Sequence, residues 1–455
     1  MPKASQALLM IIGPAALLLS ACGAGPALPP EQGYGADPAL PAARKQVLPV
    51  IKIAPAVGWA DGQTPEAAPG FVATALARDL EHPRWLYVLP NGDVLIAETN
   101  APPKPGDDKG LKGFFEKIIM KRAGAAAPSA DRITLVRDAD NDGTPEARTT
   151  FLSGLHSPFG MALVGDTFYV ADSDALVAFP YQPGQTRITA APRKVADLPA
   201  GPINHHWTKN VIASPDGSRL YVTVGSNSNV GENGMAAEER RAAILEIDPA
   251  TGASRVFASG LRNPNGMDWQ PQSGALWTSV NERDEIGNDL VPDYMTSVRD
   301  GGFYGWPYSY YGQTVDARVK PQRPDLVARA IKPDYALGAH TASLGLTFYK
   351  ADAFPARYRG GAFIGQHGSW NRKPVNGYKV AFVPFANGMP SGPAETFLTG
   401  FLNAKGEALG RPVGVAVDKS GALLVADDVG NVVWRVVSTA PPEGSGAATA
   451  TNGGK

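Results

Sequence analysis

Between about residue 70 and residue 438, the chain repeats one pattern of an apolar run, a polar turn and a second apolar run. Two clear copies are Leu86–Leu89 with Val94–Glu98, and Val415–Asp418 with Ala422–Ala426. Asn-Gly and Asp-Gly turns between alternating apolar runs are the strongest short-range signal for a β-hairpin, and the first copy carries Asn91-Gly92. The pattern therefore predicts a series of antiparallel hairpins.

A short motif precedes several of these hairpins. Residues 154–161 (GLHSPFGM) recur as residues 260–267 (GLRNPNGM), in part as residues 80–85 (LEHPRW), and in degenerate form as residues 411–415 (RPVGV). Two further hairpin copies span residues 210–224 and 344–365. Six units of about 60 residues each have the spacing of propeller blades with their loops. We predict an all-β, six-bladed β-propeller; seven blades is the alternative, and a solenoid fits antiparallel hairpins less well.

Three insertions interrupt the repeats, at Ala101–Ser129, Gly225–Glu239 and Ile286–Asp300. In a propeller, excursions on one face form the wall of a pocket, which is the role we expect for them. The composition excludes one class of partner. A net charge of −1 and the lack of a basic block argue against nucleic acid as the partner.

The N-terminus predicts export. Lys3, an apolar run from Leu8 to Leu19 and the sequence Leu19-Ser20-Ala21-Cys22 resemble a lipoprotein signal peptide with its lipobox (residues 1–22). Cys22 is the one cysteine of the sequence, which suits a lipid anchor, although a plain cleaved signal peptide is the alternative. Gly23 favours outer-membrane sorting on the periplasmic side. Residues 23–69 are rich in Ala, Pro and Gly and predict a tether, and residues 439–455 predict a disordered tail.

Several polar clusters lie at strand starts and ends. His205 and His206 open the third unit, and only one of two adjacent residues on a strand faces the axis. An imidazole is the best proton acceptor at neutral pH, whereas a structural histidine is the alternative. Arg262 and Asn263 hold the equivalent place one blade later, where their donors suit carboxylate or quinone oxygens or, alternatively, brace a turn.

Two acidic runs are candidate cation sites. Residues 281–284 (NERD) end an inner strand, where carboxylates and carbonyls bind Ca²⁺ or form surface ion pairs. Residues 138–143 (DADNDG) begin like a calcium loop, but Thr149 stands where an EF-hand needs a bidentate carboxylate. We interpret this second run as an acidic turn between outer strands, with a weak calcium site as the alternative.

Basic residues also enter the fifth and sixth units, through residues 365–372 (GQHGSWNR) and Arg411. Four consecutive blades thus bring a cation or imidazole near a strand start or end, and an axial pocket with that lining would hold a planar polyanion. No P-loop or G-x-G-x-x-G run leads from a strand into a helix, so a nicotinamide cofactor on a Rossmann fold is not expected.

A family resemblance is carried by five motifs in order along about residues 70–438: residues 206–209 (HWTK), 260–267, 281–287 (NERDEIG), 302–307 (GFYGWP) and 367–372 (HGSWNR). Together they resemble the dehydrogenases of sugars that depend on pyrroloquinoline quinone (PQQ). The L-sorbosone dehydrogenase-like branch is the nearest, and the soluble glucose dehydrogenases are more distant.

The resemblance implies PQQ and Ca²⁺ as cofactors, a sugar or sugar-derived aldehyde as substrate, and a periplasmic or membrane electron acceptor other than NAD(P). It implies that His206 is the catalytic base and that Asp284, near it, orients or polarises it. The resemblance also implies that the cofactor is contacted by Arg262, Asn263, Asn281, Arg372 and Arg411. It implies that the backbone carbonyls of Glu282 and Arg283 are ligands of the metal. Two other functions remain open on the same scaffold: a calcium-dependent lactonase or related hydrolase, and a propeller that only binds a partner or glycan.

Overall fold

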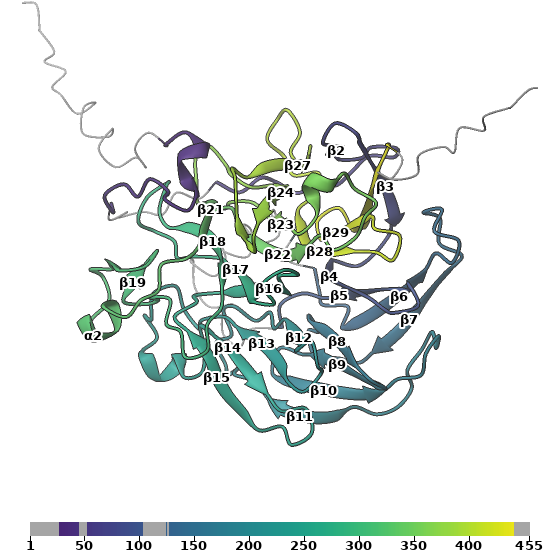
Figure 1. Ribbon diagram of the computed structural model, residues 1–455, viewed down its shortest axis with the longest axis horizontal. Coiled ribbons are helices and arrows are strands. Elements are labelled where there is room, and N and C mark those ends of the chain that lie inside the picture. The colour runs from purple at the N-terminus through teal and green to yellow at the C-terminus, as the bar shows by residue number, and fades with distance from the viewer. Residues whose placement is uncertain (1–26, 45–51, 103–123, 125–126, 441–455) are drawn as a thin grey trace, which may run out of the picture.

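The computed structural model describes residues 27–44, 52–102, 124 and 127–440. Its sheets are arranged around a common centre, with strands β4, β8, β12, β16, β22 and β28 innermost (Figure 1). The predicted six-bladed β-propeller is confirmed. Within the described residues, no helix has the length and apolar character needed to cross a membrane.

Each blade is an antiparallel sheet with its strands in sequence order from the axis outward. Blade 1 holds β4 (Pro83–Val88), β5 (Val94–Glu98), β6 (Arg132–Arg137) and β7 (Ala147–Ser153); blade 2 holds β8 (Met161–Val164), β9 (Thr167–Ala171), β10 (Ala175–Pro180) and β11 (Arg193–Asp197); blade 3 holds β12 (Val211–Ala213), β13 (Leu220–Val224), β14 (Ala243–Ile247) and β15 (Ser254–Ser259). Blade 4 holds β16 (Pro264–Trp269), β17 (Leu276–Val280), β18 (Pro292–Ser297) and β21 (Tyr335–Ala339); blade 5 holds β22 (Ser343–Phe348), β23 (Ala362–Gln366), β24 (Lys379–Val383) and β27 (Glu395–Thr399). The remaining elements are short: hairpins β19 (Ser309–Tyr310) with β20 (Thr314–Val315) and β25 (Phe385–Ala386) with β26 (Met389–Pro390), and helices η2 (Pro30–Gly33), η3 (Met235–Glu238), α2 (Pro324–Val327) and η4 (Ala356–Tyr358).

Blade 6 closes the ring with both ends of the repeat region. Its strands β28 (Pro412–Val417), β29 (Leu423–Asp427) and β30 (Val432–Ser438) are completed on the outside by β3 (Phe71–Ala77). Strand β3 pairs with β30 in antiparallel register, from Phe71 opposite Ser438 to Ala77 opposite Val433. The last sheet therefore forms only when the start and the end of the propeller meet.

The hydrophobic core is divided between neighbouring blades. One buried cluster lies between each adjacent pair; for example, Phe151 and Phe168 join blades 1 and 2, and Phe363 and Trp434 belong to the cluster of blades 5 and 6. A single sheet cannot bury both of its faces, so the radial packing of blades supplies what each lacks.

The glycine of the repeated motif is required where inner strands meet. A Cβ atom on Gly160 would lie 2.2 Å from the backbone nitrogen of Val211, in the inner strand of the next blade. On Gly266 it would lie 2.3 Å from the backbone nitrogen of Leu346. The recurrence of Gly-Met in the motif thus reflects close backbone contact beside the axis.

The predicted tether is corrected by the structure wherever residues 23–69 are described. Strand β1 (Tyr34–Gly35) adds to the outer edge of blade 4 by pairing with β21, and β2 (Glu66–Ala67) pairs with β27 at the edge of blade 5. Trp59 packs against Trp434 and donates its indole N–H to Asp427 at 2.7 Å. Backbone pairing and one large aromatic side chain hold a segment whose composition alone offers little apolar surface. Cys22, most of the first insertion and the tail from residue 441 lie outside the described residues.

Candidate active site

One end of the propeller collects the titratable side chains, and we call it the site face. It is the end at which the inner strands begin, so it carries the connections that enter each blade and those that join the second strand of a blade to the third. Every blade places one basic or imidazole side chain there, shortly before its inner strand: His82, His156, His206, Arg262, His340 and Arg411. The predicted series of four such residues thus extends around the whole ring.

His206 is held in one tautomer by Ser226. Its Nδ1 lies 2.9 Å from the carbonyl oxygen and 3.0 Å from the Oγ of Ser226, and that Oγ donates its own hydrogen to the carbonyl of Ser228 at 2.6 Å. Both atoms facing Nδ1 therefore accept, so Nδ1 carries the proton and Nε2 keeps its lone pair. Burial, followed by the charge of Arg262, holds the pKa of His206 well below 6.5. The side chain is a neutral imidazole at pH 7 that can accept a proton at Nε2.

Lys209 supports the backbone of this histidine. Its Nζ donates to the carbonyl oxygens of His206 at 3.4 Å and Trp207 at 3.2 Å. Burial lowers the pKa of Lys209 well below its usual value, since no carboxylate forms a salt bridge with it in the described residues. The amine therefore acts as a brace for the peptide that carries the base.

Asp284 is the centre of a buried network on blades 4 and 5. Its Oδ1 accepts hydrogen bonds from Nδ1 of His340 at 3.1 Å and from Nδ2 of Asn371 at 2.7 Å. Its Oδ2 lies 3.5 Å from Nη2 of Arg262. Burial acts to raise the pKa of Asp284, but the hydrogen bond from His340 and the charge of Arg262 outweigh it and lower the pKa.

His340 was not predicted from the sequence, and its contacts define its charge. Its Nε2 lies 2.9 Å from the carbonyl oxygen of Gly287, which can only accept, while Nδ1 faces the ionised carboxylate of Asp284. Both nitrogens must therefore carry hydrogen, which makes His340 an imidazolium. Burial acts to lower its pKa, and the hydrogen bond and charge of Asp284 outweigh that effect and raise it.

The role predicted for Asp284 thus differs from its contacts. The sequence placed it beside His206 to orient the base, whereas in the structure Asp284 binds His340, Asn371 and Arg262. Ser226 takes the orienting place at His206. Asp284 acts on the base only indirectly, because it fixes the guanidinium of Arg262 that lowers the pKa of His206.

Arg262 connects the predicted cofactor and metal residues. Its Nη1 donates to the carbonyl oxygen of Glu282 at 2.7 Å and lies 3.5 Å from Oδ1 of Asn281. The backbone N–H of Asn281 in turn donates to the carbonyl of Asn263 at 3.1 Å. The structure therefore brings these four residues together, as the sequence predicted.

The carbonyl oxygens predicted to bind the metal already accept hydrogen bonds within the protein. The carbonyl of Glu282 is already bonded to Arg262, and the carbonyl of Arg283 accepts a long hydrogen bond of 3.4 Å from the N–H of Val291. The side chain of Arg283 pairs with Asp316 at 2.8 Å. In this geometry the two carbonyls do not form a cation site, because a guanidinium occupies one of them.

The two arginines predicted to contact cofactor carboxylates differ. Arg372 is 3% exposed, and its guanidinium donates hydrogen bonds to the carbonyls of Asn288 and Pro374 and to the carboxylate of Asp289. It braces the loop that follows Asp284. Arg411 is also buried, but within the described residues its Nε has no partner and its one side-chain hydrogen bond is a long one of 3.4 Å to the carbonyl of Ala54. Its guanidinium lies over the ring of Tyr378.

A second network, missed by the sequence reasoning, surrounds Asp428 near Arg411. The carboxylate of Asp428 binds Arg84 at 2.7 Å and His367 at 2.9 Å, and these partners lower its pKa against the effect of burial. Burial lowers the pKa of His367 to about 4, although Asp428 opposes this. Residues 82–84 (HPR) occupy the motif position of Asn263-Pro264-Asn265, and this correspondence was the signal available in the sequence.

Unpaired polar atoms test whether this face suits a bound cofactor. Buried side-chain atoms without a hydrogen-bond partner include Nε of Arg84, Nε of Arg411, Oδ1 of Asn263 and Oδ1 of Asn371. Buried polar groups are nearly always paired in folded proteins, so such a group of orphans marks a place for a polar ligand. Donors on arginines and acceptors on asparagines fit an oxygen-rich anion such as PQQ.

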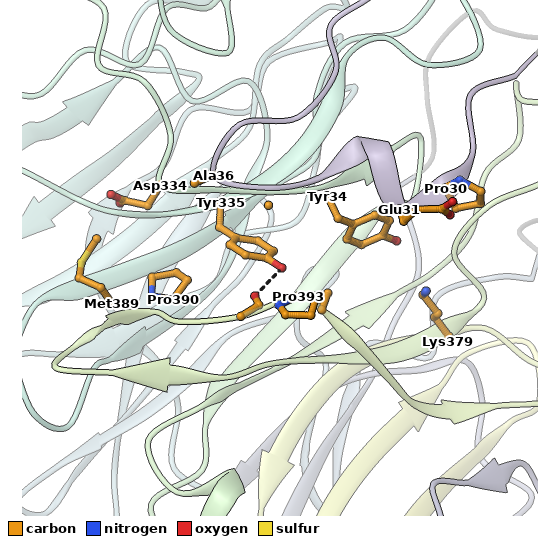
Figure 2. Close-up of a pocket in the computed structure, with 13 residues that line it drawn as sticks. Pro30, Glu31, Tyr34, Ala36, Asp334, Tyr335, Lys379, Met389, Pro390 and Pro393 are labelled. Carbon is orange, nitrogen blue, oxygen red and sulfur yellow. Dashed lines mark hydrogen bonds between the residues drawn. The ribbon is translucent and has the colours of Figure 1, made fainter.

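Two cavities lie away from this face. One of about 660 Å³ is on the outer edge of blades 4 and 5, where Tyr34 and Tyr335 line it and the hydroxyl of Tyr335 donates to the carbonyl of Gly392 (Figure 2). The other, of about 570 Å³, lies between the far ends of all six inner strands. Neither contains the network of His206, Arg262 and Asp284, and we place the candidate site with that network because chemistry requires its titratable groups.

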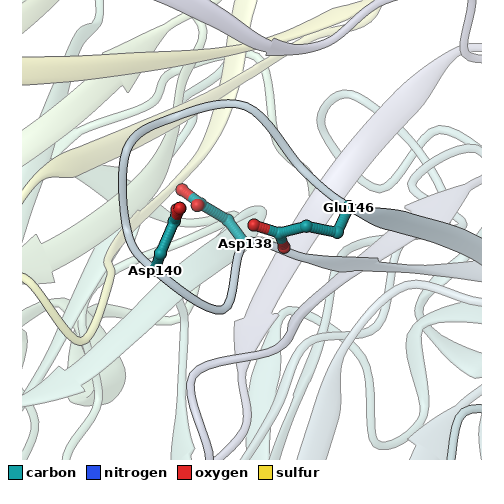
Figure 3. A group of neighbouring side chains, drawn as sticks. All are labelled: Asp138, Asp140 and Glu146. Carbon is teal, nitrogen blue, oxygen red and sulfur yellow. The ribbon is translucent and has the colours of Figure 1, made fainter.

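The acidic run at residues 138–143 is the turn between outer strands β6 and β7, as predicted. Carboxylate oxygens of Asp138, Asp140 and Glu146 lie within 4.8 Å of one another (Figure 3). The backbone N–H groups of Gly143 and Ala139 donate to Asp138 and Glu146, respectively. The turn is at the opposite end of the blade from the site face.

Comparison with known proteins agrees with the resemblance found in the sequence. Residues 171–369 match the family model described as Glucose / Sorbosone dehydrogenase, and residues 319–439 match a model described as TrAA12-like. Residues 171–369, less than half of the chain, thus resemble a glucose/sorbosone dehydrogenase domain. The resemblance to the PQQ-dependent sugar dehydrogenases is thereby confirmed.

Three relatives illustrate the match. An uncharacterized protein of Borreliella burgdorferi is 31% identical over 241 residues, which cover 52% of this chain and 62% of that protein. The aldose sugar dehydrogenase YliI of Escherichia coli is 30% identical over 120 residues, or 26% of this chain and 30% of the relative. A PQQ-dependent pyranose dehydrogenase of Coprinopsis cinerea is 26% identical over 223 residues, or 40% and 30% of the two chains. The chain thus spans less than two thirds of each of these relatives.

The holo form of the PQQ domain of the Coprinopsis cinerea pyranose dehydrogenase also has the same fold. It superposes with a TM-score of 0.66 at 20% identity, over 85% of this chain and 100% of that domain.

Proposed function

We propose that this protein is a PQQ-dependent dehydrogenase that oxidises a sugar or a sugar-derived aldehyde. The observation that carries the proposal is His206, a neutral imidazole whose Nδ1–H is fixed by Ser226 and whose Nε2 is free of partners in the described residues. It lies on a face that also carries Arg262 and unpaired arginine and asparagine atoms. The printed names of the relatives from Escherichia coli and Coprinopsis cinerea agree with this substrate class.

Different residues of the site face serve proton transfer and cofactor binding in this proposal. His206 takes the proton of the substrate hydroxyl at Nε2, and Ser226 stabilises the imidazolium that results by accepting from Nδ1. Arg262, Asn263 and Asn281 would hold the quinone oxygens of the cofactor, and Arg411 would hold one of its carboxylates. When bound, PQQ supplies the acceptor for the hydride that leaves the substrate carbon.

Calcium is proposed on the resemblance alone, and no ligands are assigned to it, because the carbonyls of Glu282 and Arg283 do not form a cation site in this structure. Because Arg262 holds the carbonyl of Glu282 at 2.7 Å, we assign no step to the ion. Titration with Ca²⁺ and removal with a chelator test this part separately: unchanged PQQ affinity and activity after chelation would remove calcium from the proposal.

The main experiment is reconstitution. Protein purified without cofactor is titrated with PQQ and Ca²⁺, and dye reduction is followed with a panel of aldoses and sugar aldehydes. We expect saturable binding and activity in the wild type. His206→Ala should bind PQQ with similar affinity and lose turnover by at least about a hundredfold, the lower end of general base contributions. Absence of PQQ binding to the wild type would contradict the proposal.

We also propose that the protein is exported and anchored by a lipid on Cys22 at the periplasmic side of the outer membrane, from which electrons pass to a periplasmic or membrane acceptor. The lipobox-like sequence before Cys22 supports this. Cys22→Ser should move the protein from the membrane to the soluble fraction. A variant that stays on membranes would contradict lipid anchoring.

A further inference from the structure

The N-terminal segment reaches the site face before it reaches any other part of the propeller. The backbone N–H of Leu28 donates to the carboxylate of Asp289 at 3.0 Å, and Asp289 also pairs with Arg372. This is the loop whose Gly287 carbonyl holds His340. The first described part of the chain is therefore fixed to the loop that carries Asp284.

The segment returns to the same face twice more. The N–H of Arg44 donates to the carbonyl of Ile286 at 3.0 Å, and the N–H of Lys52 donates to the carbonyl of Trp370 at 2.8 Å. The N–H of Val57 then pairs with the carbonyl of Ala408, close to Arg411. These contacts fix the start of the chain to blades 4, 5 and 6 at one end of the propeller.

The distance from Cys22 to this face is short. Leu28 is six positions after Cys22, and a chain of six residues spans at most about 22 Å when fully extended. With a lipid on Cys22, the rim of the site face cannot be farther than this from the bilayer surface. The chain reaches the neighbourhood of β25 and β26 later, where Pro30 and Glu31 line a cavity together with Met389 and Pro390.

Four of the eight large apolar side chains that are exposed in the described residues lie at the same end. Trp370 is 40% exposed, Met235 43%, Ile203 48% and Val57 52%, and all four lie on connections or contacts of the site face. Trp370 is the one exposed tryptophan of the described residues, which include all eight of the sequence. A tryptophan among smaller apolar residues, with the exposed Lys52 and Lys373 nearby, is the composition of surfaces that lie at the membrane interface.

We propose that the site face docks onto a lipid bilayer, with Trp370, Met235, Ile203 and Val57 in contact with the interface. This rests on the proposed lipid anchor, and it goes beyond it by fixing which face of the propeller meets the membrane. A face held there delivers electrons to an acceptor dissolved in the bilayer more readily than to a soluble one.

The test uses the full lipidated protein on phosphatidylcholine–phosphatidylglycerol vesicles, prepared with or without brominated phosphatidylcholine, which quenches tryptophan emission only on contact. The contribution of Trp370 is the difference between wild type and Trp370→Phe. We expect brominated lipid to remove most of that contribution. A Trp370 contribution that is equally bright in both vesicles, with the protein still bound, would overturn the proposal.

A matched probe on the far face controls for general contact with lipid. Met389 is 46% exposed in β26, so Met389→Trp combined with Trp370→Phe moves the one exposed tryptophan to the opposite end. Its emission should be unaffected by brominated lipid; quenching equal to that of Trp370 would also overturn the proposal. Lengthening the chain with a Gly/Ser insertion between Gly25 and Pro26 should weaken the quenching of Trp370.

The outcome is independent of the proposed enzyme, because neither cofactor nor turnover enters the measurement. Wild-type protein that fails to associate with vesicles would refute the anchor and this orientation while leaving the dehydrogenase unaffected. Failure to bind PQQ would do the reverse.

Discussion

Replacing Asp284 with asparagine tests the buried charge network directly. The substitution keeps the volume of the side chain and removes its negative charge, so neither a cavity nor a clash contributes. His340 and Arg262 then lose the carboxylate that lies 3.1 Å and 3.5 Å from their nitrogens, and both remain buried. Removing one partner of a buried ion pair costs about 3–5 kcal/mol. We expect Asp284→Asn to lower the free energy of unfolding by that amount.

The neighbouring residue supplies a matched control. Glu285 pairs with Arg318 at 3.3 Å, but these side chains are 41% and 34% exposed. A pair in contact with solvent contributes about 0–1 kcal/mol, so Glu285→Gln should change the free energy of unfolding by no more than that. The two adjacent carboxylates thus predict different costs because the side chain of Asp284 is 15% exposed and that of Glu285 is 41% exposed.

Urea unfolding at pH 7 measures both variants, read as a shift of the midpoint at unchanged slope. A loss below about 1 kcal/mol for Asp284→Asn would refute the imidazolium assignment of His340, because an uncharged histidine would not miss the carboxylate. Combining it with His340→Gln adds a check. The second substitution should cost less in the Asp284→Asn background than alone, because its partner is already gone.

The network also predicts a pH dependence. The pKa of Asp284 is lowered in the folded state, so its contribution is present above the unfolded value of about 4 and is lost as pH falls through the folded pKa. The pKa of His340 is raised, so its contribution is complete below the unfolded value of about 6.5 and is lost as pH rises through the folded pKa. The excess stability of wild type over Asp284→Asn should therefore be greatest between about pH 4 and pH 6.5.

Three further predictions follow from single contacts. Because the pKa of His206 is held well below 6.5, kcat/KM of the reconstituted enzyme should stay constant down through pH 6.5 and fall only at lower pH; a fall centred at or above pH 6.5 would contradict the neutral, buried base. Gly266→Ala should lower the free energy of unfolding by at least about 1–3 kcal/mol, because its Cβ would lie 2.3 Å from the backbone of Leu346. Gly274 has open space around it but a φ of +67°, so Gly274→Ala should cost only about 1 kcal/mol, from the left-handed backbone. Lys209→Met should leave the free energy of unfolding unchanged or raise it. The lowered pKa of Lys209 means that folding disfavours its charged amine below about pH 10, and the substitution removes this cost. A loss of several kcal/mol would show that the hydrogen bonds of the amine to two carbonyls outweigh the cost of burying it.

The fold was predictable because its signals are local. Each hairpin is encoded within a few residues, and predicted strands such as Val94–Glu98 and Leu220–Val224 have the same bounds in the structure. Closure of blade 6 by β3 was missed, because the pairing of Phe71 with Ser438 joins residues that no turn connects. The packing of Trp59 on blade 6 was missed for the same reason.

The sequence predicted several residues of the site but not the contacts between them. Motif position identified His206, Arg262 and Arg411, because every blade enters the ring through the same connection. The partner of each side chain depends instead on which blades are neighbours. His340 is 56 residues from Asp284, and Asn371 is 87 residues from it, so neither contact has a local pattern. Yet the ring order was itself predictable, and blade 4 must lie beside blade 5. A sequence search at the position just before each inner strand would therefore have found His340 next to Asp284, although only the structure shows that its two acceptors make it a cation.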